Sequence, residues 1–380
     1  MAKTALVVGG TGPTGPFIVE GLAERGYAVT ILHRGFHEVE FKYPVKHIHG
    51  EPHFKEEFQQ ALGDLTFDVV VCMYGRLRLV AESCVGKTER FIAVGAGTPE
   101  DQHLPIYDVI QEREDGTILQ RVTEAREQVF DYHRAGHYQA TYIGYPIVYG
   151  PRQPGPLEWS IIRRILDGRR KFILLDNGLY IRNCPYVENC AQTVLLAIDK
   201  PEASAGKLFA ATEEALPTDR YRLQLIADIM GVGDEIETYS FPLDLGLPGW
   251  WWGNGDFNFA KEGRPPHIVH RTVAVEKLKH ELGYRDVVSV EEAHRRTVQW
   301  LLDHKPERGG EDERIMGDPF DYAAEDAYIE AYKRFTRELD TIPFSGYFSV
   351  HRYQHPKKPW EHGTSLVITE RKTARKGKKS

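Results

Sequence analysis

The chain has 380 residues, a formal net charge of −7, 41% hydrophobic and 27% charged residues. This balance is typical of a globular protein of one large domain or two joined ones, and it argues against general nucleic-acid binding. Because no apolar run approaches the roughly 18 residues of a membrane span, no signal peptide precedes the first strand and no C-x-x-C pair occurs, we expect a cytoplasmic protein with reduced thiols.

Near the amino terminus an apolar strand, Ala5–Val8, breaks into glycines and then into a helix over Phe17–Arg25. Three of the glycines fall on a G-x-x-G-x-x-G frame. Glycines let the backbone turn tightly and approach a pyrophosphate, whose charge lies at the positive end of the following helix. The alternative is an ordinary turn between strand and helix. The predicted dinucleotide site contains Gly9, Thr11, Gly12, Pro13, Thr14 and Gly15.

The second predicted strand, Tyr27–His33, indicates which dinucleotide binds. NAD-binding proteins usually end this strand in an acidic residue that accepts hydrogen bonds from the ribose. This chain has His33 and Arg34 there, and a guanidinium is a planar fork suited to a phosphate. NADP(H) is therefore the expected cofactor, and a solvated surface arginine is the alternative.

Further strands alternate with helices. Apolar runs predict strands over Val45–His49, Phe67–Met73, Phe91–Val94 and Ala140–Ile147, with a long helix over Arg121–Ala135 before the last. This alternation predicts an α/β fold, a Rossmann doubly wound parallel sheet. Further cofactor contacts are expected from residues near the ends of these strands: Glu51, Met73 and Gly95.

From Pro151 the chain is expected to leave the sheet and to build a smaller C-terminal substrate lobe. A return to the sheet is predicted for Cys184–Ile198, before the chain leaves again near Lys207. Beyond the lobe, Asp321–Leu339 is expected to form one amphipathic helix. The predicted parts are a Rossmann domain over 1–150 completed by about 180–200, a substrate lobe over 151–179 and 201–305, an extension over 306–368 packing on the body, and a disordered basic tail over 369–380.

Several of these stretches resemble the extended short-chain dehydrogenase/reductase superfamily, the NAD-dependent epimerase/dehydratase group. The resemblance covers roughly residues 3–303. It implies a serine or threonine after the fifth strand and a tyrosine in Tyr-x-x-x-Lys that donates a proton, its pKa lowered by the lysine. The stretches that carry it are the glycine turn, His33-Arg34-Gly35, Ile147–Arg152, Tyr186–Ala191, Leu282–Tyr284 and Val298–Leu301.

The catalytic set of that superfamily is missing here. The serine position falls in Val94–Gly97, where no hydroxyl occurs before Thr98. Alignment places the Tyr-x-x-x-Lys pair near Leu119 and Thr123, and no lysine occurs between residues 87 and 171. The chain therefore resembles an atypical member, and another group has to supply the proton.

Three tyrosines near strand ends are the candidate donors: Tyr107 first, then Tyr74 and Tyr149. For each of them, ordinary packing with a satisfied hydroxyl is the alternative. His103 and His133 are further candidate acids, with surface histidines as the alternative. The sequence shows no metal-ligand spacing.

The tryptophans within Trp250–Phe259 lie where the substrate lobe of the superfamily closes over the cofactor. They favour a bulky, apolar or aromatic small-molecule substrate, and a satellite hydrophobic cluster is the alternative. The leading hypothesis is an NADP(H)-dependent oxidoreductase that reduces a conjugated double bond, an imine or a carbonyl. A non-catalytic NADP-binding sensor or scaffold and an epimerase or dehydratase are the alternatives. No membrane or nucleic-acid partner is expected, and a homodimer is left open.

Overall fold

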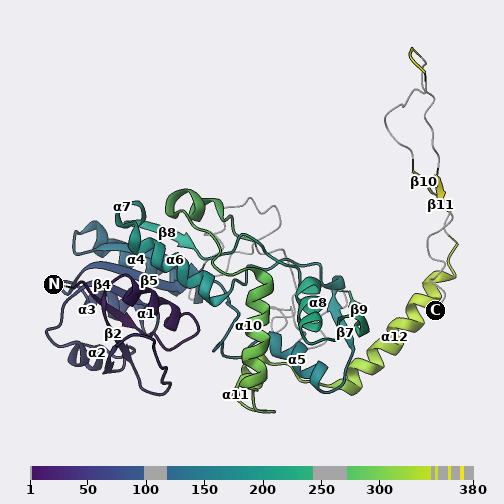
Figure 1. The fold of residues 1–380 in the computed structure, drawn as a ribbon, viewed down its shortest axis with the longest axis horizontal. Coiled ribbons are helices and arrows are strands. Elements are labelled where there is room, and N and C mark those ends of the chain that lie inside the picture. Colours follow the sequence, from purple (N-terminus) through teal and green to yellow (C-terminus); the bar gives the residue numbers. More distant parts are fainter. Residues whose placement is uncertain are drawn as a thin grey trace. The chain divides into compact units, whose positions relative to one another are not determined.

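The computed structural model describes residues 2–97, 118–242, 272–343, 347–349, 358–360 and 369–371. The chain divides into a larger unit, Met1–Phe320, and a smaller one, Asp321–Ser380, and each is described by itself (Figure 1).

The larger unit is built around a parallel sheet of seven strands in the order β3-β2-β1-β4-β5-β6-β8. The chain starts in the middle of this sheet and adds strands outward in both directions, so the order reverses between β1 and β4. This arrangement confirms the predicted α/β Rossmann fold. The strands are β1 (Thr4–Val8), β2 (Ala28–His33), β3 (Lys46–His49), β4 (Phe67–Cys72), β5 (Thr88–Ala96), β6 (Gln139–Tyr145) and β8 (Lys207–Ala210).

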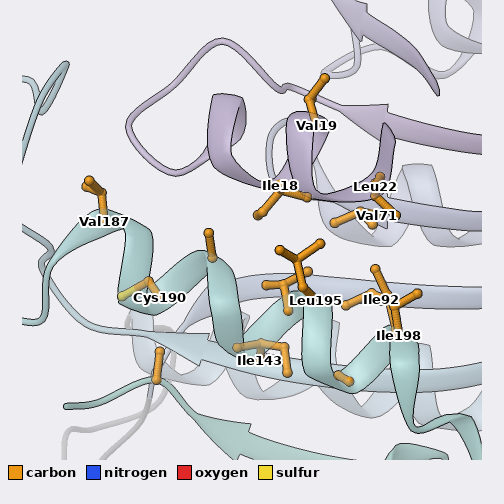
Figure 2. Close-up of a cluster of buried hydrophobic side chains, with 14 of the residues drawn as sticks. Ile18, Val19, Leu22, Val71, Ile92, Ile143, Val187, Cys190, Leu195 and Ile198 are labelled. Carbon is orange, nitrogen blue, oxygen red and sulfur yellow. The ribbon is translucent and has the colours of Figure 1, made fainter. Parts of the chain in front are cut away.

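Both faces of the sheet are buried, as the continuous apolar runs of its strands require. Side chains alternate along a strand, so Ala5 and Val7 of β1 join one cluster while Leu6 and Val8 join the other. Helices α1 (Gly15–Glu24) and α6 (Val187–Asp199) cover the first face (Figure 2). The second cluster includes residues of α2 (Lys55–Leu62), α3 (Leu77–Ser83) and α4 (Ile118–Arg134).

The completion of the sheet differs from the sequence prediction. The stretch predicted to return to the sheet, Cys184–Ile198, forms most of helix α6, whose apolar side packs against α1 and the strands (Figure 2). The seventh strand is β8, where the chain was expected to leave the sheet. Its four residues pair with Thr141–Gly144 of β6. Because β8 has only four residues, its sequence shows no periodic apolar pattern, and its pairing with β6 is what identifies it as a strand.

A second lobe of the larger unit surrounds its own apolar cluster, which includes Trp159, Phe172, Ile226 and Val298. A two-stranded parallel sheet, β7 (Lys171–Leu175) with β9 (Glu237–Phe241), belongs to this lobe. The other elements of the described residues 151–242 and 272–320 are α5 (Glu158–Leu166), η2 (Asp176–Gly178), α7 (Pro201–Ser204), α8 (Asp219–Ile229), η3 (Gly233–Glu235), a π-helical turn (Leu278–Leu282), α10 (Val290–Asp303) and α11 (Glu311–Met316).

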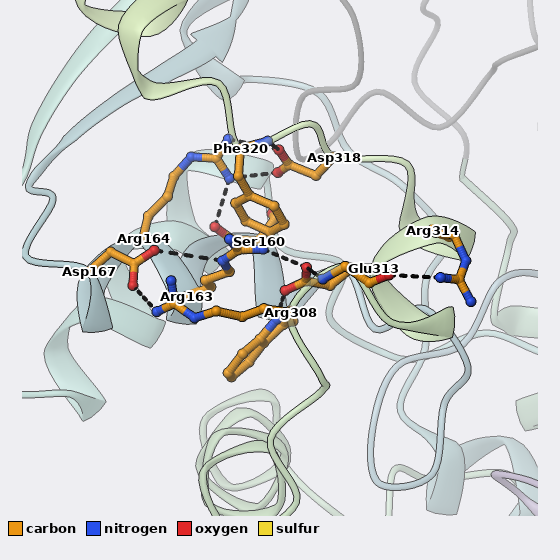
Figure 3. Close-up of polar contacts among 11 residues, drawn as sticks. Ser160, Arg163, Arg164, Asp167, Arg308, Glu313, Arg314, Asp318 and Phe320 are labelled. Carbon is orange, nitrogen blue, oxygen red and sulfur yellow. Dashed lines mark hydrogen bonds and ion pairs between the residues drawn. The ribbon is translucent and has the colours of Figure 1, made fainter.

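Residues 306–320 belong to the larger unit, whereas the sequence placed a boundary at 306. Asp318 accepts two hydrogen bonds from Arg164 on α5, at 2.6 and 3.0 Å. Glu313 accepts hydrogen bonds from the indole of Trp159 at 2.9 Å and from Arg163 at 2.5 Å (Figure 3). The Phe320 ring lies against both guanidinium groups (Figure 3). These contacts join residues more than a hundred positions apart, which local sequence patterns do not reveal.

The smaller unit begins with α12 (Tyr322–Asp340), one residue from the predicted bounds. The Asp321 carboxylate caps it by accepting a hydrogen bond from the Ala324 N–H at 3.0 Å. Two short strands, β10 (Tyr347–Ser349) and β11 (Thr369–Arg371), pair antiparallel. In the part of the chain that the structure describes, no helix is both long and apolar enough to cross a bilayer.

The Arg164–Asp318 pair gives a stability prediction. The Asp318 side chain is 0% and the Arg164 side chain 5% exposed. Asp318→Ala removes the carboxylate that accepts two hydrogen bonds from a buried guanidinium, so we expect the free energy of unfolding to fall by about 3–5 kcal/mol. The control is Asp199→Ala, which breaks the solvent-exposed pair with Arg25 and should lower it by about 1 kcal/mol or less. Urea unfolding of both variants makes the comparison, and equal losses would contradict the assignment.

Candidate functional site

The glycine turn lies at the carboxyl end of β1. Gly9 and Gly10 have backbone φ values of 106° and 91°, which residues with a side chain rarely adopt. A Cβ on Gly15 would overlap the backbone of Gly10, lying 2.7 Å from its Cα. A Cβ on Gly12 would meet no atom of the described residues within 4 Å. Gly9, Gly10 and Gly15 thus shape the turn, while the space at Gly12 stays open for a ligand.

The amino terminus of α1 follows this turn and carries no acidic residue in its first turn. Its N-cap, Thr14, makes no side-chain capping hydrogen bond within the described part of the chain. The Thr14 side chain instead shares a hydrogen bond with the hydroxyl of Tyr145, which also donates to the Cys190 carbonyl at 3.1 Å. The Gly15 N–H donates to the Gly12 carbonyl at 3.1 Å and Pro16 has no N–H, so it is the positive dipole end of α1 beside the open space at Gly12 that fits a dinucleotide pyrophosphate.

Arg34 lies beside this turn, at the carboxyl end of β2. Its side chain is 39% exposed, and its Cζ lies 4.9 Å from the ring centroid of Phe36 and 5.3 Å from that of Tyr74. Tyr74 in turn lies close to Gly9, because a Cβ on that glycine would be 3.1 Å from the Tyr74 Cβ. The structure thus brings Arg34, Tyr74 and the glycine turn together across three strand ends.

A carboxylate also reaches Arg34, although the sequence has none at the end of β2. Glu51, which follows β3, places its Oε2 3.8 Å from Arg34 Nη1. Its Oε1 accepts hydrogen bonds from His53, from the backbone N–H at 3.3 Å and from Nδ1 at 2.6 Å. Burial raises the pKa of Glu51, but the hydrogen bonds from His53 outweigh that effect and hold it below its usual value. Glu51 is therefore ionised at neutral pH.

Two other residues predicted to contact the cofactor, Gly95 and His33, lie against other side chains instead. A Cβ on Gly95 would clash with the Tyr142 ring, 3.0 Å from its Cζ, so the missing side chain makes room for Tyr142. His33 is 3% exposed, and its Nε2 lies 3.1 Å from Nδ1 of His47. Burial lowers the pKa of His33, which keeps its ring neutral. Met73 is half-buried beside Gly9.

Tyr149 lies in the interior, away from solvent. It is 1% exposed, between the ring of Tyr186 at 5.4 Å and the ring of His294 at 4.6 Å, with Arg222 Cζ 5.0 Å from its centroid. Its hydroxyl has no hydrogen-bond partner among the described residues, and burial raises its pKa well above the usual value. This burial argues against Tyr149 as a proton donor to a substrate.

The remaining candidate acids fall elsewhere. Tyr107 and His103 lie outside the described residues, as does the Trp250–Phe259 stretch. His133 Nδ1 lies 3.3 Å from the Tyr138 carbonyl, just before β6 begins, so it is at the amino edge of the sheet. Ligands of open parallel sheets bind at the opposite edge. Thr123, near the expected catalytic pair, lies within α4.

A buried polar group close to Tyr149 is one that the sequence did not reveal. Glu213 is 2% exposed, and its Oε1 accepts hydrogen bonds from Asn189 Nδ2 at 2.6 Å and from the Tyr186 N–H at 2.9 Å. Burial raises the pKa of Glu213 to about 7. Glu213 ties α6 to the segment after β8, so its carboxyl serves the fold on the side of β6 away from Arg34.

Comparisons with known proteins agree with this geometry. The model of the NAD dependent epimerase/dehydratase family matches residues 123–210, which run from α4 to β8. A search of curated proteins finds no match.

Several solved structures share the fold. The Thermotoga maritima UDP-glucose 4-epimerase with UDP-glucose is 18% identical, with a TM-score of 0.61 over 80% of this chain and 100% of that one. The Bordetella bronchiseptica enzyme WbmF with NAD+ is 16% identical, with a TM-score of 0.58 over 83% and 96%. The Bacillus anthracis dTDP-glucose 4,6-dehydratase with NAD is 15% identical, with a TM-score of 0.59 over 80% and 98%.

The resemblance indicated by the sequence motifs is therefore confirmed over residues 123–210 by the family model, and the solved structures share the fold.

Glu213 gives a pH prediction. Its folded-state pKa of about 7 lies above its ordinary value of 4.5, so the stability it contributes is complete below about pH 4.5 and is lost as the pH rises to about 7. Relative to Glu213→Gln, the wild-type free energy of unfolding should fall by up to about 3 kcal/mol across this range. Urea unfolding at several pH values measures it. The exposed neighbour supplies a control, Glu214→Gln, which should show no such decline, and a flat difference for Glu213→Gln would refute the shift.

Proposed function

We propose that the protein is an NADP(H)-dependent oxidoreductase of the extended short-chain dehydrogenase/reductase type. One observation carries the proposal: an uncapped helix amino terminus behind the glycine turn lies beside an exposed arginine at the next strand end. The first feature suits a pyrophosphate and the second suits the phosphate on the adenosine ribose.

Each residue near the turn has a role in this proposal. The positive dipole end of α1 would bind the pyrophosphate, and Arg34 the 2′-phosphate. Tyr74 is one of the candidate proton donors from the sequence. In this proposal it would instead pack against the adenosine half of the cofactor, because its ring lies beside Arg34. Glu51 offers an ionised acceptor to the same half. When bound, NADP(H) supplies the hydride.

The proton would come from Tyr107, on the segment that follows β5. In a doubly wound sheet the half beyond the switch point binds the second nucleotide of the cofactor, and β5 belongs to that half. The Tyr107 hydroxyl would donate to the negative charge that develops on the substrate. The tryptophans of Trp250–Phe259 favour a bulky, apolar or aromatic small molecule with a conjugated double bond, an imine or a carbonyl.

Use of NAD(H) is a second candidate, because Glu51 lies 3.8 Å from Arg34 and a carboxylate there would repel a phosphate. The proposal favours NADP(H), since Glu51 already accepts two hydrogen bonds from His53 and a single contact with Arg34 leaves other guanidinium donors free. An epimerase or dehydratase also fits the family, but no lysine occurs between residues 87 and 171, where the Tyr-x-x-x-Lys pair of the family is expected. A non-catalytic sensor would bind NADPH tightly but would not oxidise it with any substrate.

Arg34→Ala tests the cofactor assignment. Because the guanidinium would lose its charge-assisted hydrogen bonds to the 2′-phosphate, NADPH binding should weaken by about 1.5–3 kcal/mol while NADH binding stays nearly the same. Fluorescence titration of both cofactors measures the difference. Arg78→Ala, which removes a similarly exposed arginine on α3, is the matched control and should leave both affinities unchanged. Equal losses for NADPH and NADH in Arg34→Ala would overturn the phosphate assignment.

Tyr107→Phe tests the proton donor. Loss of the hydroxyl should lower turnover about a hundredfold or more and leave NADPH affinity intact. The assay follows NADPH oxidation over a panel of enones, imines and aromatic ketones. Tyr43→Phe, which alters an exposed tyrosine, should retain full turnover. Full activity of Tyr107→Phe would exclude this donor, and tight NADPH binding by the wild type without any turnover would favour the sensor.

A further inference from the structure

Three histidines lie together at the edge of the sheet, on β2 and β3. His33 ends β2, and His47 and His49 alternate along β3 with Ile48 between them. In the parallel register His33 is the partner of His49, and Ile31 is the partner of His47. Side chains two residues apart on a strand point to the same face, so all three imidazoles share one face of the sheet. Their ring centroids confirm the grouping, with His33 5.1 Å from His47 and 5.0 Å from His49.

Glu38, on the loop between the two strands, completes this cluster. Its Oε2 lies 3.6 Å from His47 Nδ1 and its Oε1 3.7 Å from His49 Nε2. Both separations exceed the roughly 2.7–3.2 Å of a hydrogen bond. The carboxylate therefore faces two imidazole nitrogens without bonding directly to either.

We propose that His33, Glu38, His47 and His49 bind a divalent transition-metal ion, with Zn²⁺ as the expected occupant. Ligand atoms of His33, Glu38 and His49 lie within 4.8 Å of one another, and His33 Nε2 lies 3.1 Å from His47 Nδ1. Zn–N bonds of roughly 2.0–2.1 Å in tetrahedral geometry place neighbouring ligand atoms about 3.3 Å apart. The distances from His47 Nδ1 to His33 Nε2 and to Glu38 Oε2 are close to this value, whereas the 4.8 Å group does not include His47, so His49 and Glu38 have to move inward for all four to share one ion.

The exposure of the four side chains fits that movement. His33 is buried and held by the strand, so it supplies a fixed ligand, whereas the His49 and Glu38 side chains are 65% and 59% exposed and free to rotate. Three imidazoles and one carboxylate are a ligand set that suits zinc. Binding through His33 Nε2 would put the ring proton on Nδ1, so the long 3.3 Å contact from the Gly35 N–H would be given up.

The position of the cluster indicates what a bound ion would do to the neighbouring backbone. It joins the last residue of β2 to an edge strand of four residues and to the loop that starts at Arg34. A bound ion would fix this loop, and with it the backbone from which Arg34 extends. The site is distinct from the glycine turn, and it uses none of the residues proposed to hold the pyrophosphate or to donate a proton.

The test uses the full chain without a polyhistidine tag, freed of metal by chelation, in the absence of any dinucleotide. Titration with ZnCl₂ by calorimetry should show one saturable site, and the melting temperature should rise with Zn²⁺ concentration. Co²⁺ should give the visible absorption of a tetrahedral complex. His49→Ala and Glu38→Gln change exposed side chains, so folding should be retained while Zn²⁺ affinity falls at least tenfold. His280→Ala, an exposed histidine elsewhere, should bind Zn²⁺ like the wild type.

The proposal fails if the wild type binds no stoichiometric Zn²⁺, or if His49→Ala and Glu38→Gln bind it as tightly as the wild type does. An equal loss of affinity in His280→Ala would mean that binding is non-specific, and it would overturn the proposal as well. None of these outcomes depends on NADPH, so a failure here leaves the proposed oxidoreductase function untouched.

Discussion

The close contact between Gly15 and the backbone of Gly10 is the constraint on which the site depends. Strand β1 is buried on both faces, so the chain has to reverse within a few residues at its carboxyl end before α1 can pack on the sheet. Side chains at these glycines would push the helix away from the strand. With glycine there, the amino terminus of α1 lies at the switch point between β1 and β4, and its positive dipole end is placed where ligands of such sheets bind.

The electrostatics of this region follow from strand order. Because β2 and β3 lie on one side of β1 and β4 on the other, the chain segments after these strands meet at one edge. Arg34, Glu51 and Tyr74 therefore come together although they are distant in sequence. The arginine lies beside an ionised carboxylate, so groups of opposite charge meet at this edge. The histidine cluster on the same two strands adds a second polar feature beside this edge.

The sequence predicted a doubly wound sheet and most of its strands, because buried parallel strands read as continuous apolar runs and the turn glycines mark where the first strand ends. It missed β8, which is too short to carry a periodic signal, and it began an extension packing on the body at 306, although residues 306–320 belong to the larger unit. The contacts of Trp159, Arg163 and Arg164 with Glu313 and Asp318 join distant segments through single side chains. The His47-Ile48-His49 alternation was visible in the sequence, but its meaning depends on His33 being its neighbour in the sheet.

By itself, then, the sequence determined the class of fold, the glycine turn and the lack of a lysine between residues 87 and 171, since each depends on residues close together in the chain. Only the tertiary structure decided which side chains meet. It placed Tyr74 beside Arg34 and buried Tyr149 against His294 and Arg222. It also packed the ring of Tyr142 against Gly95. The physical reason is that a side chain's surroundings are set by the pairing of strands and the packing of helices, and those join residues that no local pattern connects.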